Sequence, residues 1–288
     1  MQFKSKESIG ILFAILSYFS FSLLDAIQKT AVTTHSIFQL LFVKYLFIFF
    51  LSLFESKRKN NIKIYKSKNF KLQILRSLLS IVESGCFVLA FKYLSLANAH
   101  SVGALAPVIV VALSSIFLKE KITIKTWFAI FIGLVGVLII LRPTSSIFDI
   151  KSTIPLLAAF FLGLYQIITK KTSEYDSPEV SLFYTSIVGI IITLFLAIIF
   201  WQPTNVDSII LFLGIGIFFS LGFYFQINAL SNARASIIQP FHYTLIFWAI
   251  VLGYIFYDDI PDLLTIIGAI IITVSGIFVI NQTYKNKI

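Results

Sequence analysis

The sequence predicts an all-α integral membrane protein in which ten transmembrane helices form two inverted five-helix repeats. The first reason is composition: 58% of the residues are hydrophobic, only 12% are charged, and the mean hydropathy is +0.93. Soluble domains contain a smaller apolar share. The second reason is that long stretches, such as 9–24 and 263–280, carry no charged residue. Helical runs of this kind suit a hydrocarbon core of about 30 Å.

Ten hydrophobic segments follow one another along the chain. In lipid, only helices and closed barrels satisfy their own backbone hydrogen bonds, and these segments are too long and too uniformly apolar for barrel strands. We interpret the first segment as a retained helix rather than a signal peptide, because Asp25 lies near its end and no small-residue cleavage site follows. The expected helices are 9–28, 36–54, 73–93, 97–118, 124–141, 153–169, 178–200, 208–229, 234–256 and 261–281.

The basic residues predict the orientation of the chain. With the N-terminus in the cytoplasm, 18 lysines and arginines flank the inner ends of the helices and four flank the outer ends. Seven of the 18 lie in one loop, 55–72. This bias predicts that both termini are cytoplasmic. It also explains the net charge of +10 as an orientation signal and a lipid-facing patch rather than a nucleic-acid site. The abundance of Ile, Lys, Phe and Asn is typical of an AT-rich bacterial genome, so we expect a bacterial cytoplasmic (inner) membrane.

The two halves of the chain share an order of features, which is the third reason for the predicted fold. The fourth and ninth segments each follow a run of small residues, contain a proline (Pro107 or Pro240), and precede a glycine-bearing helix. Because each half has five helices, the second must insert upside down. The pattern predicts inverted repeats at 1–145 and 146–288, with a site near the midplane between them. Chance similarity among helices rich in Leu, Ile and Phe is the alternative.

Charged residues inside the hydrophobic segments are the strongest site candidates, because a charge at the membrane centre costs about 2.5–3.5 kcal/mol on insertion scales. Glu83 lies in the middle of the third segment, and Lys44 lies inside the second. Counted from the outer ends, both lie about 12–15 Å deep at ~1.5 Å per residue, a depth at which they are able to pair. We expect Glu83 to bind a cationic group or a proton and Lys44 to bind an anionic group. A structural ion pair is the alternative.

The ninth segment concentrates polar and aromatic side chains beside Pro240, which removes a backbone hydrogen bond and frees a carbonyl. These side chains are Gln239, His242, Tyr243 and Trp248. We expect them to bind a polar organic molecule together with the charged pair. Ordinary packing is the alternative, because 16% of the residues are aromatic.

Polar residues toward the ends of the first and sixth segments predict a gate or mouth. Asp25 lies about one turn from the outer end of the first segment, and Lys29 follows at i,i+4 spacing. Gln166 near the end of the sixth segment and Lys170 just after it repeat this spacing. The alternatives are hydration of the helix end at Asp25 and a simple surface pair with Lys29.

Signals for a metal, a cofactor or an enzyme are weak. Cys86 is the single cysteine, and the three histidines lack metal-ligand spacing, so we expect no metal and no cofactor. The run 258–262 (Asp-Asp-Ile-Pro-Asp) supports one alternative, a membrane-embedded enzyme acting on a lipid or prenyl diphosphate, but a proline interrupts it. A channel would show polar-lined helices or a filter loop, and the sequence contains no P-loop motif of an ATPase.

Short motifs in both halves carry a family resemblance. They are Leu75-Arg76-Ser77-Leu78, Leu118-Lys119-Glu120-Lys121, Gly133-Leu134-Val135-Gly136, Gly163-Leu164-Tyr165-Gln166 and Gln239-Pro240-Phe241-His242-Tyr243-Thr244. The chain resembles the EamA family of the drug/metabolite transporter superfamily over nearly its whole length, and its first half is somewhat similar to the S-adenosylmethionine uptake branch. Lys119 and Asp258 depart from the family pattern, which often has glycine there.

The resemblance implies a secondary transporter working by alternating access. Its substrate would be a small polar organic metabolite, such as an amino acid, an amine or S-adenosylmethionine. The lipid bilayer is its other partner, protons or a counter-substrate would drive it, and the oligomeric state stays open.

Overall fold

The fold is helical throughout the part of the chain that the computed structural model describes. The described residues are 6–59, 63–93, 99, 102–141, 151, 153–248, 251 and 262–285. The α-helices are α1 (Lys6–Ala31), α2 (Ile37–Arg58), α3 (Phe70–Tyr93), α5 (Ala106–Phe117), α6 (Ile124–Leu141), α7 (Thr153–Thr172), α8 (Pro178–Ile199), α9 (Val206–Asn232), α10 (Ala235–Ile238) and α12 (Leu263–Lys285). A 3₁₀ helix, η3 (Gln239–Tyr243), follows α10 directly.

Most of the expected segments are single helices with nearly the expected bounds. Six of them, α1, α2, α3, α7, α8 and α9, are long and apolar enough to cross a membrane by length and composition. The helices α6 and α12 also match expected segments. The prediction of an all-helical membrane protein is therefore confirmed for the described residues.

The fourth and ninth segments differ from the continuous helices expected at 97–118 and 234–256. In the fourth, residues 99, 102 and 103 are helical, residues 104 and 105 form a turn, and α5 follows with Pro107 in its first turn rather than in a helix interior. In the ninth, α10 gives way at once to η3, and Pro240 lies in the first turn of that 3₁₀ helix. Proline fits a first turn because the missing N–H has no helical partner there. The remainder of each expected helix lies partly outside the described residues.

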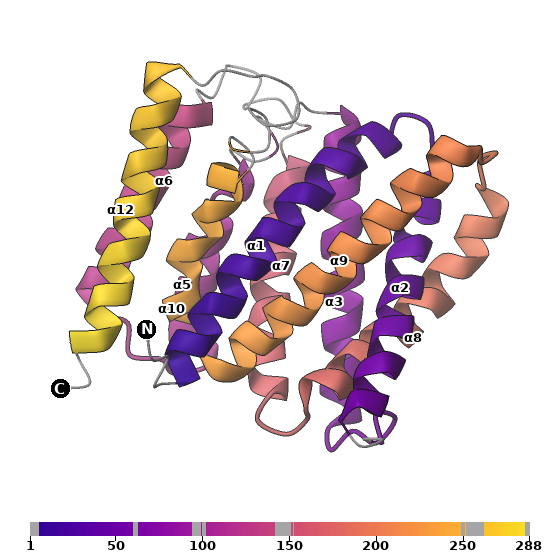
Figure 1. Ribbon diagram of the computed structural model, residues 1–288. Helices are drawn as coiled ribbons and strands as arrows, with labels where there is room; N and C mark the ends of the chain where they lie inside the picture. Colours follow the sequence, from indigo (N-terminus) through magenta and orange to yellow (C-terminus); the bar gives the residue numbers. More distant parts are fainter. Residues whose placement is uncertain are drawn as a thin grey trace.

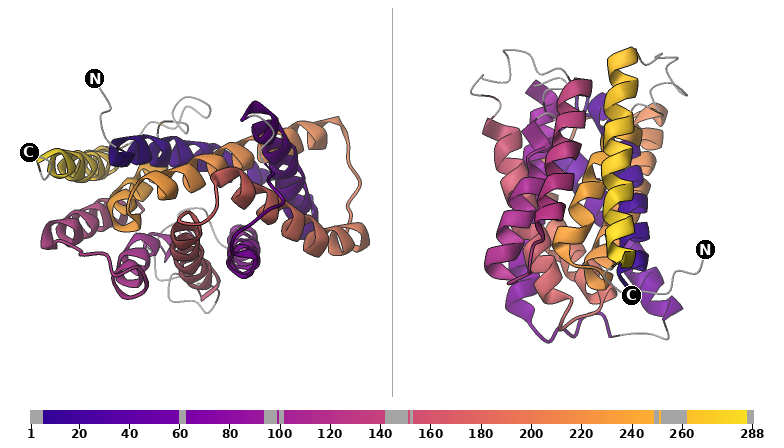
Figure 2. Two further views of the ribbon diagram at one scale, coloured as in Figure 1. Left: turned by 90° about the horizontal axis from the view of Figure 1, so that it is seen from below. Right: turned by 90° about the vertical axis from the view of Figure 1, so that its left-hand side faces the viewer.

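Helices from the two halves of the chain pack against each other in pairs. The most extensive helix contacts join α1 to α9, α2 to α8, α6 to α12 and α3 to α7 (Figure 1). Figure 2 shows two layers, with α1 and α9 in one and α5, α7 and α3 in the other. Small residues allow close approach: a Cβ added at Gly189 of α8 would lie 2.2 Å from a carbon of the Tyr45 ring of α2.

Polar contacts between loops identify the two ends of the bundle. At the first, which we call the loop end because it carries the basic loop 55–72, Asp176 accepts hydrogen bonds from Ser67 Oγ (2.5 Å) and the Lys68 amide (2.7 Å). At the opposite end, His35 Nε2 and Ser208 Oγ lie 3.0 Å apart. Consequently α1 and α3 run away from the loop end, whereas α7 and α9 run toward it.

A turn at the loop end joins α5 to α6 and also closes against α10. Lys119 in this turn has a φ of 53°, a left-handed conformation that glycine adopts most readily. The carboxylate of the next residue, Glu120, accepts hydrogen bonds from the Ala235 and Ser236 amides, both at 3.0 Å. The positive φ explains why glycine suits the position of Lys119. Glu120 supplies acceptors for the first N–H groups of α10, which lack helical partners.

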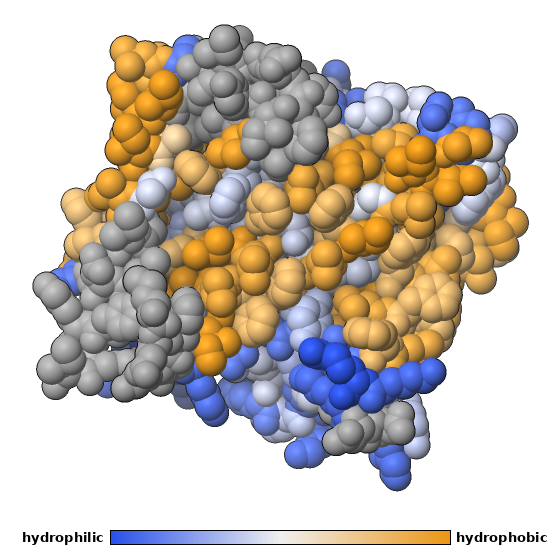
Figure 3. All heavy atoms as spheres, in the orientation of Figure 1, coloured by the Kyte–Doolittle hydropathy of each residue, from blue (hydrophilic) through white to orange (hydrophobic). Residues whose placement is uncertain are grey.

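The flank of the molecule is apolar, as a lipid-facing surface requires. In Figure 3 hydrophobic residues cover the sides of the helices, and hydrophilic residues gather at the loop end. On α8, for example, Ile191, Phe195 and Ile198 are each more than 60% exposed (69%, 69% and 67%). Exposed apolar area of this kind is costly in water and suits a bilayer.

Candidate functional site

A cavity of about 110 Å³ lies between the two layers of helices. Residues of α1, α2, α3, α7, α9 and η3 line it, together with residues of the segments 102–105 and 244–248. Both halves of the chain therefore contribute to one site. Five residues of α1 line it, and their spacing of three and four residues puts them on one face of the helix: Tyr18, Phe21, Leu24, Asp25 and Gln28.

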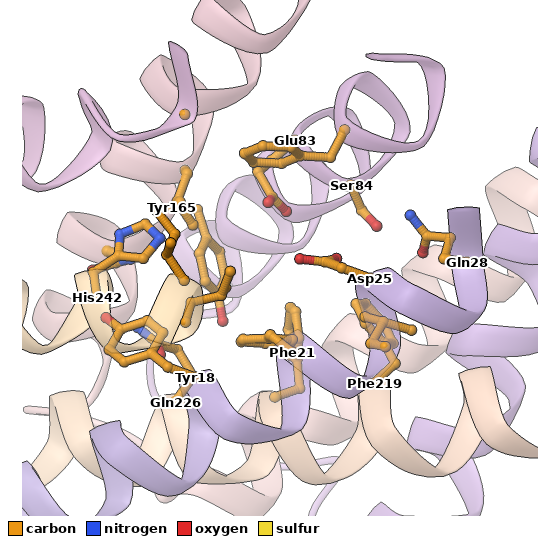
Figure 4. Close-up of a pocket in the computed structure, with 18 of the residues that line it drawn as sticks. Tyr18, Phe21, Asp25, Gln28, Glu83, Ser84, Tyr165, Phe219, Gln226 and His242 are labelled. Atoms are coloured by element: carbon orange, nitrogen blue, oxygen red, sulfur yellow. The ribbon is translucent and has the colours of Figure 1, made fainter. Parts of the chain in front are cut away.

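One side of the cavity is charged. Asp25 of α1, Lys44 of α2 and Glu83 of α3 all line it, and in Figure 4 Asp25 and Glu83 lie on the same side, next to Ser84. The Lys44 ammonium donates a hydrogen bond to Ser84 Oγ (3.1 Å) and lies 4.7 Å from the centroid of the Phe219 ring, a favourable cation–π distance. Two acids and one base thus share a site that is otherwise surrounded by apolar helices.

Lys44 and Glu83 lie near each other but do not form the ion pair that was considered from the sequence. No ion pair joins them among the described residues, and the only hydrogen-bond partner found there for Lys44 is Ser84. Asp25 and Glu83 nevertheless lie close enough to Lys44 for their charges to interact. Lys44 and Glu83 thus face one cavity without a direct ion pair between them.

The other side of the cavity is aromatic. The Tyr18 and His242 rings stack with centroids 4.9 Å apart and an interplanar angle of 9°, and Figure 4 shows both beside Tyr165 and Gln226. Tyr243 also lines this side. Stacked rings and amide groups are able to hold a planar or partly polar organic group.

The structure brings most of the predicted site residues together. Gln239 lies directly behind the cavity lining, because its Nε2 donates to Gln166 Oε1 at 2.7 Å. Trp248 does not line the cavity; its ring packs edge-on against Phe19 with centroids 5.0 Å apart. The predicted residues that do line it are Asp25, Lys44, Glu83, Gln166, His242 and Tyr243.

The residues predicted for a gate separate into two groups. Asp25 and Gln166 line the cavity. Lys29 and Lys170 instead bind the ends of helices: Lys29 Nζ donates to the Phe91 carbonyl at 2.6 Å, and Lys170 Nζ donates to two carbonyls of the α9 terminus at 2.8 Å each. Each lysine thus stabilises the C-terminus of another helix, where carbonyl groups lack helical partners.

Several residues of the site were not predicted. Tyr18 and Tyr165 line the cavity, and the position of Tyr18 two turns before Asp25 on the same helix face was the available signal. Arg76, counted with the basic residues of the inner helix ends, is completely buried (0% exposed). The run 258–262, on which the enzyme alternative rests, lies outside the described residues except for Asp262.

Comparison with known proteins assigns the family. The model of the EamA-like transporter family matches residues 8–142 and again residues 153–282. These two matches cover most of the chain, which therefore belongs to the EamA-like transporter family. The family and the named relatives are transporters, and the enzyme alternative has no support from them.

Named relatives handle different small molecules. The S-adenosylmethionine uptake transporter of Rickettsia conorii is 28% identical over 96% of this chain and 94% of the relative. The pseudopaline exporter CntI of Pseudomonas aeruginosa is 25% identical over 93% and 94%, and the riboflavin transporter of Vibrio cholerae is 27% identical over 77% and 76%. A solved crystal structure superposes with a TM-score of 0.82 over 98% of this chain and 99% of that one, and at 13% identity it shows the fold alone.

Proposed function

We propose that the protein is a secondary transporter that binds a small polar organic metabolite in the cavity and moves it by alternating access. The observation that carries this proposal is that Asp25, Lys44 and Glu83 reach one cavity from three helices within the apolar belt. Charges in such a place are costly unless they serve a cavity or a partner. A polar site between two sets of helices is also where secondary transporters bind substrate.

We infer that the complete architecture is ten membrane helices in two inverted repeats, 1–145 and 146–288. If each helix is replaced by its equivalent in the other half, the α1–α9 contact becomes the α7–α3 contact, and the α2–α8 and α6–α12 contacts stay the same. The packing is therefore symmetric between the halves. The opposite directions of α1 and α7 and the two matches to one family model support the same symmetry. So do Lys29 and Lys170, which belong to the first helix of each half and bind the end of the third helix of the same half.

We propose that the loop end and both termini face the cytoplasm of a bacterial inner membrane. The basic residues of the loop 55–72 support this orientation. A cysteine replacing the exposed Lys66, in a protein whose Cys86 is changed to serine, is expected to react with a membrane-impermeant maleimide only after cells are opened. Labelling of intact cells at this position would contradict the orientation.

The charges of the cavity favour a cationic or zwitterionic substrate. Two carboxylates from α1 and α3 are able to surround an ammonium or sulfonium group, and Lys44 is able to bind a carboxylate after leaving Ser84. Amino acids, amines and S-adenosylmethionine all meet this description. Protons or a counter-substrate supply the driving force in this proposal, because the acids are able to exchange a proton for a cation.

The direct test is uptake by the purified protein in liposomes. The panel contains amino acids, polyamines, S-adenosylmethionine and riboflavin, and we expect saturable uptake of a cationic or zwitterionic member above the level of empty liposomes. A control with liposomes containing the Glu83→Gln protein separates transport from leakage. Absence of uptake and binding for the whole panel would count against a polar-metabolite transporter.

A further inference from the structure

A second polar site lies beneath the cavity wall, toward the loop end. Arg76 of α3 is seven residues closer to the loop end than Glu83, a shift of about 10 Å along the helix. Its side chain is completely buried, and Arg76 is not among the residues that line the cavity. Its guanidinium carbon lies 5.8 Å from the centroid of the Tyr165 ring. Tyr165 itself lines the cavity, so its ring lies next to both the cavity and the guanidinium.

The hydrogen-bond partners of Arg76 are all uncharged. Its Nε donates to Gln73 Oε1 (3.3 Å), and one Nη donates to the Ser181 carbonyl and to Thr185 Oγ1 (2.5 Å). Among the described residues no ion pair involves Arg76. The nearby carboxylate of Asp176 is bound by Gln73 Nε2 (2.9 Å) and by the basic loop. A buried guanidinium without a contacting anion is costly.

Arg76 has a spare donor and hydroxyl groups beside it. Its other Nη has no hydrogen-bond partner in the described part of the chain. The buried hydroxyl of Tyr165 interacts with Arg76 and with Thr169, so the guanidinium and the two hydroxyls form one group of donors. Ser80 lies one turn from Arg76 on α3, and Thr169 one turn from Tyr165 on α7. A guanidinium fork beside several hydroxyls is the donor set that binds a carboxylate or a phosphate group.

We propose that Arg76, with the hydroxyls of Tyr165 and Thr169, forms an oxyanion-binding site that receives the anionic group of the substrate after it leaves the cavity toward the loop end. That the anionic group belongs to a transported substrate rests on the proposed function. The oxyanion site itself rests only on the surroundings of Arg76. Rotation of the Tyr165 side chain opens the path, because that ring lies next to both the cavity and Arg76. In this proposal Asp25 and Glu83 hold the cationic group in the cavity, and the anionic group passes from Lys44 to Arg76.

The site is tested by the effect of small oxyanions on thermal stability, since a ligand that binds the folded state raises Tm. The purified protein is heated in sodium acetate, sodium phosphate or sodium chloride at equal ionic strength. We expect acetate or phosphate to raise Tm by about 3 °C relative to chloride, and whichever acts identifies the group as a carboxylate or a phosphate. Arg76→Gln is expected to remove the shift, whereas Lys171→Met, which removes an exposed lysine of α7, is expected to keep it.

Two variants that keep a positive charge at position 76 serve as tests if Arg76→Gln does not fold. Arg76→Lys and Tyr165→Phe each remove part of the donor set, and each is expected to reduce the shift by about half or more. The inference is wrong if the shift survives in Arg76→Gln, if it is lost equally in Lys171→Met, or if neither anion acts on the wild-type protein. Full shifts in both Arg76→Lys and Tyr165→Phe would also overturn it.

Uptake of the compound panel by liposomes distinguishes failure of the oxyanion site from failure of the proposed function. Saturable uptake without an Arg76-dependent shift would remove the inner site and keep the transporter. An Arg76-dependent shift with no transported compound would keep an oxyanion site and remove the proposed function.

Discussion

Replacing Glu83 by glutamine is expected to lower transport at least about tenfold, because a contact between a buried charge and its partner is worth about 1.5–3 kcal/mol. The change keeps the shape of the side chain and removes its charge. Glu83 lines the cavity, and among the described residues it forms no ion pair with Lys44. We therefore expect the variant protein to remain folded, with an unchanged elution profile on size exclusion, and to lose uptake.

A double variant separates the functional role of Glu83 from a structural one. If Glu83 serves only to balance Lys44, then Glu83→Gln with Lys44→Met should recover both stability and transport. If Glu83 binds a cation or a proton, the double variant should be stable and still inactive. Ser84→Ala is the control, because it removes the hydrogen-bond partner of Lys44 without changing a charge, and we expect it to alter uptake by less than about threefold. Full transport by Glu83→Gln would exclude a functional role for this residue.

Replacing Lys170 by methionine is expected to destabilise the protein by about 2–3 kcal/mol, because two carbonyls at the end of α9 lose a charged donor. Lys170 Nζ donates to the Leu230 and Ala233 carbonyls at 2.8 Å each. These contacts join α7 to the terminus of α9 beside the turn that leads into α10. We expect a lower Tm and uptake reduced about tenfold, because closure of this end depends on the position of α9.

The neighbouring lysine supplies the matched control. Lys171 is exposed on the same helix, so Lys171→Met changes the same charge without removing a helix-end contact. We expect its Tm and uptake to stay within experimental error of the wild type. Equal behaviour of the two variants, whether both are impaired or both are active, would show that the contact between Lys170 and α9 has no special role.

Much of the helical framework was predictable, because apolar runs bounded by charges determine where most membrane helices begin and end. The predicted helix ends were less accurate, and this changed where two site residues were expected. The first segment was expected to end at 28, but α1 continues to Ala31, which puts Asp25 deeper and inside the cavity wall. The third was expected to begin at 73, but α3 begins at Phe70, which puts Arg76 well inside the helix.

Contacts between helices were beyond prediction from one sequence. Counting depth along two helices correctly suggested that Lys44 and Glu83 lie near each other, since both line one cavity. Depth alone does not give rotation about a helix axis, so the choice of Ser84 and Phe219 as neighbours of Lys44 was not foreseeable. The hydrogen bond between Gln239 and Gln166 likewise depends on how η3 packs against α7.

Counterflow in liposomes tests the central claim, a carrier with one site exposed alternately to the two sides. Liposomes containing the protein are loaded with an excess of the unlabelled substrate found in the panel and diluted into a trace of labelled substrate. The proposed mechanism predicts transient accumulation of label above its equilibrium level, because a loaded site returns repeatedly and exchanges its contents. Simple equilibration of the label at the same rate with and without internal substrate would contradict alternating access.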